Sequence, residues 1–144
     1  MTDAKVLSII TEVIKDFFWN NIKYIYGFNY HLAQNEYFED IFNLDIGFIV
    51  FANSGEQYKL MIRFSGVQGV SLYAGGRLVQ LCLFEILYVK DDGWCEARYW
   101  VRDYENENIK FYCDEMQFIS IEKNDIKGLY VNNSRKWVHE VRKI

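Results

Sequence analysis

The chain has 144 residues, of which 51% are hydrophobic, 18% aromatic and 25% charged, and it contains no proline. That size fits one domain, and the aromatic content excludes a disordered chain, a collagen and a coiled coil. The net charge of -4 argues against general binding to a nucleic-acid backbone, which needs a dominant basic surface.

The first residues predict an amphipathic helix. Apolar side chains recur at i, i+3, i+4 and i+7 spacing from Val6 to Phe18, and charged residues fall on the other side. Thr2 or Asp3 is a suitable N-cap. We therefore expect a helix over residues 3–19, followed by a strand over 22–30 and a short helix over 36–42.

From residue 45 onward the apolar residues follow a period of two, and turn residues separate the runs. Strands are predicted over 45–52, 57–65, 67–73, 78–90, 94–104, 109–114 and 116–122. The turns between them include a hairpin loop at Asn53-Ser54-Gly55 and another at Asp91-Asp92-Gly93. No helix-length crossover separates these strands, so we expect them to pair antiparallel.

The expected fold class is α+β. The N-terminal helix should pack on a largely antiparallel meander sheet of about six or seven strands, at residues 45–122, within a single domain over 1–144. Residues 124–144 stay unassigned.

A hairpin that pairs Lys90 with Trp94 places Glu85 opposite Tyr99 on one face of the sheet. An unpartnered carboxylate there is a candidate general base, whereas a hydrogen-bonded one is structural, and the structural role is favoured. Taking Tyr104 against Ile109 puts Arg98 opposite Glu115 as an ordinary cross-strand pair. The same registers put Trp100 opposite Cys113.

No catalytic residue, metal site or cofactor site is predicted. The two histidines stand alone, and the cysteines lack the paired spacing of a zinc site, so free thiols are expected at Cys82, Cys95 and Cys113. Ala74-Gly75-Gly76-Arg77 lacks the phosphate-loop pattern and predicts a plain turn.

The charges are unevenly distributed. Residues 1–115 hold 17 acidic and 10 basic residues, a net of -7, whereas residues 116–144 hold 3 and 6, a net of +3. Acidic residues beside aromatics at two strand ends are candidate anchors for a protein partner. These candidate partner-binding residues are Asp103, Tyr104, Glu105 and Glu107 at the preferred end, and Asp91, Asp92 and Trp94 at the other. A solvated rim with aromatic edges is the alternative.

The longest apolar run, over 81–89, is interrupted by Glu85 and is too short to cross a bilayer. The N-terminus also lacks a basic start and a small-residue cleavage site. The expectation is a cytoplasmic protein that binds neither membrane nor nucleic acid.

Aromatic strand patterns carry a family resemblance. They stand at Gln80-Leu81-Cys82-Leu83-Phe84-Glu85-Ile86, Gly93-Trp94, Tyr99-Trp100-Val101-Arg102-Asp103-Tyr104-Glu105 and Phe111-Tyr112-Cys113. Over about residues 45–122 the chain resembles small bacterial immunity proteins, the cytoplasmic antitoxins encoded beside polymorphic or contact-dependent growth-inhibition toxins. The resemblance implies a stoichiometric inhibitor of the neighbouring toxin domain, without turnover or cofactor. It transfers no binding residues.

The acidic net charge is consistent with capture of a basic toxin such as a nuclease. The alternative function is a small-ligand-binding protein or enzyme with an aromatic pocket between helix and sheet around Glu85 and Tyr99. A structural adaptor that uses an exposed strand edge stays open as well.

Overall fold

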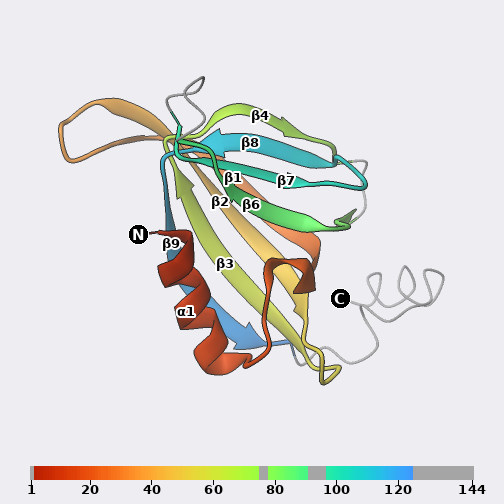
Figure 1. Ribbon diagram of the computed structural model, residues 1–144. Coiled ribbons are helices and arrows are strands. Elements are labelled where there is room, and N and C mark those ends of the chain that lie inside the picture. Colours follow the sequence, from red (N-terminus) through yellow and green to blue (C-terminus); the bar gives the residue numbers. More distant parts are fainter. Residues whose placement is uncertain (1, 75–77, 91–96, 125–144) are drawn as a thin grey trace.

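The computed structural model describes residues 2–74, 78–90 and 97–124, which form one α-helix, one 3-10 helix and nine strands (Figure 1). Helix α1 spans Asp3–Val13 and the 3-10 helix η1 spans Trp19–Asn21. The strands are β1 Ile22–Gln34, β2 Asp40–Phe51, β3 Gln57–Ser65, β4 Gln68–Leu72, β5 Val79–Gln80, β6 Phe84–Tyr88, β7 Tyr99–Asp103, β8 Ile109–Cys113 and β9 Glu115–Lys123.

The strands form two sheets that share one core. The first has the order β5-β1-β2-β3-β9 and the second the order β4-β8-β7-β6, and every pairing is antiparallel. Phenylalanines join the sheets, because Phe48 packs on Phe84 at 5.2 Å and Phe64 on Phe111 at 5.0 Å between ring centroids. The α+β class and the antiparallel pairing are confirmed, but two sheets replace the single one that the sequence predicted.

Helix α1 packs on this core next to β9 (Figure 1). The backbone N–H of Lys5 donates to Thr2 Oγ1 at 3.2 Å, which caps the helix start, and Val6 and Ile10 are fully buried. The predicted helix over 3–19 is too long, since α1 ends at Val13 and a turn follows in which the Phe17 N–H donates to the Ile14 carbonyl at 3.1 Å.

The burial of two aromatics accounts for the early helix end. Phe17 and Trp19 both enter the core and contact each other edge to face at 5.6 Å. Residues two apart share a side in an extended chain but point nearly opposite ways in a helix. The extended backbone at Phe18, between the two, therefore buries both rings and leaves Phe18 itself exposed.

The helix predicted over 36–42 is wrong. A turn follows Gln34, and β2 begins at Asp40, paired with β1 along its length. The alternation of Phe42, Leu44 and Ile46 is a strand pattern, and the ring of Phe42 stacks on Tyr30 of β1 at 4.8 Å. Packing across the two strands thus outweighs the helical tendency that was expected of residues 36–42.

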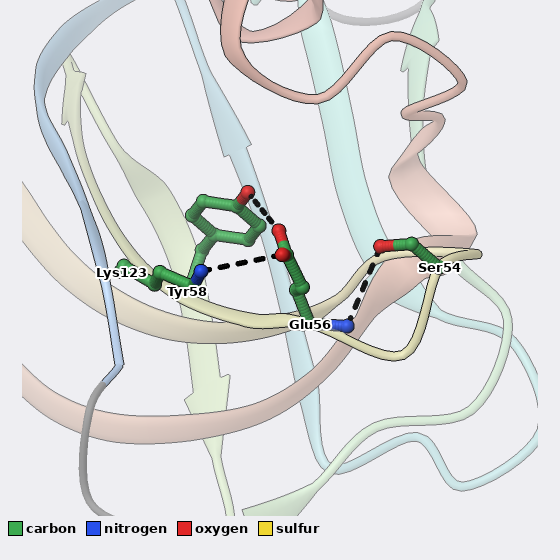
Figure 2. Close-up of polar contacts among 4 residues, drawn as sticks. All are labelled: Ser54, Glu56, Tyr58 and Lys123. Carbon is green, nitrogen blue, oxygen red and sulfur yellow. Dashed lines mark hydrogen bonds and ion pairs between the residues drawn. The ribbon is translucent and has the colours of Figure 1, made fainter.

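The hairpin that joins β2 and β3 is formed as predicted. Its loop contains Gly55 at φ +93°, a backbone conformation that glycine adopts without steric cost. Figure 2 shows that Glu56, just after the loop, accepts from the Tyr58 hydroxyl at 2.8 Å and from Lys123 at 3.2 Å. These two donors hold the pKa of Glu56 below its ordinary value and tie the hairpin to the end of β9.

Residues 78–90 do not form one central strand. Leu83 adopts a left-handed conformation at φ 58°, and it separates β5 in the first sheet from β6 at the edge of the second. Leu81, two residues before Leu83, and Phe84, directly after it, are both buried. The continuous apolar run therefore comes from a crossing between two sheets that share one core.

The other predicted features fall partly or wholly outside the described residues. Those are the turns at 74–77 and 91–93 and nearly all of the tail over 124–144. In the part of the chain that is described, no helix combines the length and apolar character needed to cross a membrane.

Candidate functional site

The outer face of the second sheet carries an unusual set of side chains. Alternation along β7 turns Tyr99, Val101 and Asp103 into the core, so that Trp100 and Arg102 lie on the outside. In the paired strands, Glu85 of β6 stands opposite Arg102 and Tyr112 of β8 stands opposite Trp100. Neighbouring strands thus bring a carboxylate, a guanidinium and aromatic rings together.

Arg102 is the centre of this group. Its Nε donates to Glu85 Oε1 at 2.6 Å, and its guanidinium carbon lies 4.2 Å from the ring centroid of Trp100 and 4.9 Å from that of Tyr104. We call Glu85, Trp100, Arg102 and Tyr104 the Arg102 cluster. Two ring faces and an ion pair hold the planar guanidinium, so its orientation is largely set before any partner binds.

The cluster borders a shallow hollow of about 370 Å³. The hollow is lined by Phe18, Asn20, Leu83, Phe84, Glu85, Arg102 and Tyr104. Phe18, Leu83 and Tyr104 are exposed around it. An open, partly apolar hollow with one oriented cation suits an inserted side chain of another protein.

A stacked pair extends the face beyond the cluster. The rings of Trp100 and Tyr112 lie 5.8 Å apart with an interplanar angle of 16°. The buried Trp100 Nε1 has no hydrogen-bond acceptor among the described residues. Lys110 lies opposite Arg102, so the basic charge continues onto β8.

Three of the four residues predicted at the preferred strand end are exposed there. Tyr104, Glu105 and Glu107 are on the surface, and only Tyr104 belongs to the Arg102 cluster. The backbone of this segment is fixed, because the N–H groups of Tyr104 and Glu105 donate to the carbonyls of Leu83 and Cys82 at 3.0 and 3.2 Å.

Asp103, the fourth residue predicted at this strand end, does not lie on the surface. Its side chain is fully buried, and its Oδ1 accepts from the backbone N–H of Ile109 at 2.8 Å. It therefore organises the turn between β7 and β8. The alternation Tyr99, Val101, Asp103 already places it on the core side of β7.

Asp103 gives a testable pH dependence. Burial raises its pKa above the ordinary 3.8, against the opposing effect of backbone N–H donors, first that of Ile109. The folded state then holds this proton more tightly than the unfolded chain, so stability falls as pH rises from 3.8 through the raised value. Asp103→Asn cannot ionise, and we expect it to gain stability relative to the wild type across that range.

Urea denaturation at a series of pH values measures this difference. Glu105→Gln is the matched control, because Glu105 is exposed and its replacement should leave the pH profile unchanged. Parallel profiles for Asp103→Asn and the wild type would contradict the assignment.

The second predicted strand end lies outside the described residues, which omit Asp91, Asp92 and Trp94. The flanking residues Lys90 and Arg98 line a larger, more polar hollow of about 580 Å³ at the opposite end of β6 and β7. Carboxylates of Glu36, Asp114 and Glu115 line it as well, so charges of both signs face it.

Glu85 and Tyr99 do not share one face of the sheet, as the predicted pocket requires. Glu85 pairs with Arg102, and Tyr99 pairs with Tyr88 three residues further along, which places Glu85 on the outer face and Tyr99 in the core. The other predicted registers are also shifted, since Tyr99 rather than Trp100 stands opposite Cys113. Arg98 therefore does not stand opposite Glu115.

Cys82 and Cys113 are free thiols, and Cys95 is outside the described residues. Burial raises the pKa of Cys113, which makes it an unreactive core residue. Among the residues that the structure describes, no three His, Cys, Asp or Glu side chains come close enough to hold a metal ion.

Comparisons with known proteins give no relative, since no family model, curated protein or solved structure matches the chain. The sequence reasoning missed the role of Arg102. Trp100, Arg102 and Tyr104 follow a period of two, and that spacing was the signal that could have placed all three side chains on one face.

Proposed function

We propose that this protein is an immunity protein, which binds a cognate bacterial toxin domain stoichiometrically and neutralises it without turnover. The observation that carries the proposal is the Arg102 cluster beside the hollow. Arginine, tryptophan and tyrosine are the residues most enriched at energetic hot spots of protein interfaces. In this cluster, Arg102 is fixed by Trp100 and Tyr104.

The toxin as partner is inferred from the sequence resemblance and from the charge. Glu105 and Glu107 are exposed immediately after Tyr104, so acidic side chains flank the exposed aromatic. A basic nuclease domain would be attracted to them. Tyr104 and Arg102 would then contribute most of the affinity, while the two glutamates speed the encounter.

Binding kinetics test this proposal. The immobilised chain is exposed to the purified C-terminal domain encoded by the neighbouring gene, over a salt series. We expect Tyr104→Ala and Arg102→Ala each to weaken binding by about 2 kcal/mol or more, roughly 30-fold, mainly through faster dissociation. Reversing Glu105 and Glu107 to lysine should slow association, and added salt should reduce that effect.

Two further variants sharpen the experiment. Arg102→Lys keeps the charge but loses the planar group that stacks between the rings, so it should bind nearly as weakly as Arg102→Ala. Tyr73→Ala removes an exposed tyrosine that lines neither the cluster nor the hollow, and it should bind as the wild type does. Absence of binding at micromolar concentration would refute the immunity function, and tight binding indifferent to the cluster variants would refute only the site.

A further inference from the structure

The hairpin of β1 and β2 extends beyond the rest of the molecule. Figure 1 shows its far end, in orange, projecting past both sheets. We call residues 26–42 the hairpin arm. β1 pairs with β5 only at Tyr24 and Ile25, and β2 pairs with β3 only from Asn43 onward, so among the described strands residues 27–42 are paired only within their own hairpin. At the base of the arm the Val67 N–H donates to the Phe42 carbonyl at 3.0 Å.

One face of the arm continues the core face of the first sheet. Residues directly opposite in an antiparallel pair point to the same side. Tyr30 stands opposite Leu44 and Phe28 opposite Ile46, and both β2 partners are buried in the core. Tyr30 and Phe28 themselves are about half exposed. The apolar side of the sheet thus extends beyond the region that the second sheet covers.

Aromatic side chains on this exposed face hold one another in a fixed arrangement. Leu32 and Phe42 stand opposite each other and are both exposed, and the ring of Phe42 stacks on Tyr30 with an interplanar angle of 4°. A flat, stacked pair loses little conformational freedom when another surface packs on it.

The turn at the tip presents two more aromatics. Asn35 Oδ1 accepts from the backbone N–H groups of Tyr37 and Glu39 at 2.9 and 3.0 Å, which fixes the turn. Tyr37 is 74% exposed and Phe38 is 82% exposed, and Phe38 has a left-handed φ of 61°. A bulky residue in that region is strained, and such strain is commonly kept where a side chain has a function.

From these observations we infer that the apolar face of the hairpin arm is a homodimer interface, occupied by the same face of a second copy of this chain. The exposed apolar residues of this face are Phe28, Tyr30, Leu32 and Phe42, and Tyr37 and Phe38 are exposed at the tip of the arm. From typical side-chain areas the face and the tip together offer about 700 Å² per chain. That area is close to the roughly 800 Å² per partner that stable interfaces bury.

The distribution of charged residues along the arm is compatible with a second copy of the chain as the partner. Residues 26–34 contain no Asp, Glu, Lys or Arg, whereas Glu36, Glu39 and Asp40 lie around the tip. In an antiparallel two-fold dimer the two acidic tips lie at opposite ends of the interface, so they do not repel each other strongly. Homodimer interfaces are also more apolar than transient ones. The stretch of β1 that supplies Phe28, Tyr30 and Leu32 thus offers no counter-charge to a strongly charged partner, whereas an identical apolar face matches it.

Analytical ultracentrifugation of the full chain up to about 100 μM tests this inference, since most stable interfaces are saturated there. We expect the wild type to sediment at twice the mass of the chain. Tyr30→Lys should raise the dimer dissociation constant at least 10-fold, because each two-fold interface then receives two like charges at its centre. Circular dichroism spectra check that this variant is folded. Tyr73→Lys, at an exposed tyrosine outside the arm, should stay dimeric.

A charge-swap mixture identifies the occupant. Tyr30→Glu alone should be as monomeric as Tyr30→Lys, and mixing the two variants should restore a mixed dimer, which only contact between two copies of the arm produces. A monomeric wild type, a monomeric Tyr73→Lys or a mixture that stays monomeric would each overturn the inference. A monomeric wild type whose Tyr30→Lys variant loses toxin binding would assign the arm to the toxin instead. Toxin binding through the Arg102 cluster is measured separately, so either proposal can fail alone.

Discussion

Replacing Ile10 with aspartate is expected to lower the free energy of unfolding by roughly 3–5 kcal/mol, the usual cost of an unpaired buried charge. Ile10 is fully buried in the cluster that also contains Phe48 and Phe64. No cationic side chain of the described residues forms an ion pair with α1. The introduced carboxyl would therefore have to stay protonated or pull the helix off the core, and each outcome destabilises the fold.

Chemical denaturation followed by tryptophan fluorescence measures the loss. Val13→Asp is the matched control, because Val13 is the last residue of the same helix and is 49% exposed. It should lose less than about 1 kcal/mol. Equal midpoints for Ile10→Asp and the wild type would mean that α1 detaches from the domain without consequence, contrary to the packing of Val6 and Ile10.

Local patterns predicted the parts of the fold that depend on neighbouring residues. Asn53-Ser54-Gly55 identified the β2–β3 hairpin because a glycine with positive φ is a local requirement. The alternation of Leu60, Ile62 and Phe64 identified β3 because each of these residues is buried. Neither feature depends on residues far away in the sequence.

Long-range packing decided the features that the sequence reasoning missed. Nothing local marks Leu83 as the residue at which the chain leaves one sheet for the other, because leucine rarely adopts positive φ. The register of β6 and β7 depends on where the loop between them closes. Val89 N–H donates to the Arg98 carbonyl at 2.8 Å, so the pairing closes outside the predicted three-residue turn. That shift moved Glu85 away from Tyr99 and placed it beside Arg102.

The candidate site was predictable only in part. Tyr104 was chosen as an aromatic beside acidic residues, and it is exposed next to the hollow. Arg102 is held in place at the site by Glu85, its neighbour across the strands. The predicted register was wrong and had placed Glu85 opposite Tyr99 instead. The hairpin arm was missed for a different reason, since its apolar face has the same pattern as a buried strand. The exposed Phe28 differs from the buried Ile46 opposite it through long-range structure, because β1 has no further strand beside it at Phe28, whereas β2 is flanked by β3 at Ile46.

Truncating Phe64 to alanine is expected to cost about 3–5 kcal/mol, as large-to-small substitutions of buried phenylalanines do. Phe64 lies on β3, is fully buried, and contacts Phe48 at 6.5 Å and Phe111 at 5.0 Å between ring centroids. Phe111 belongs to β8 in the other sheet, so the ring of Phe64 joins the two layers. Removing it leaves a cavity between sheets whose backbones are fixed by their own ladders, and the cavity should close only partly.

Phe18→Ala is the matched control for Phe64→Ala, because Phe18 is 60% exposed and its loss should cost less than about 1 kcal/mol. Urea denaturation of both variants gives the comparison, with the m-value checked for constancy. A second variant, Phe64→Leu, keeps most of the buried volume and should lose markedly less than Phe64→Ala. If Phe64→Ala were no less stable than Phe18→Ala, the sheets would not be packed through this ring, and the shared core of the two sheets would have to be abandoned.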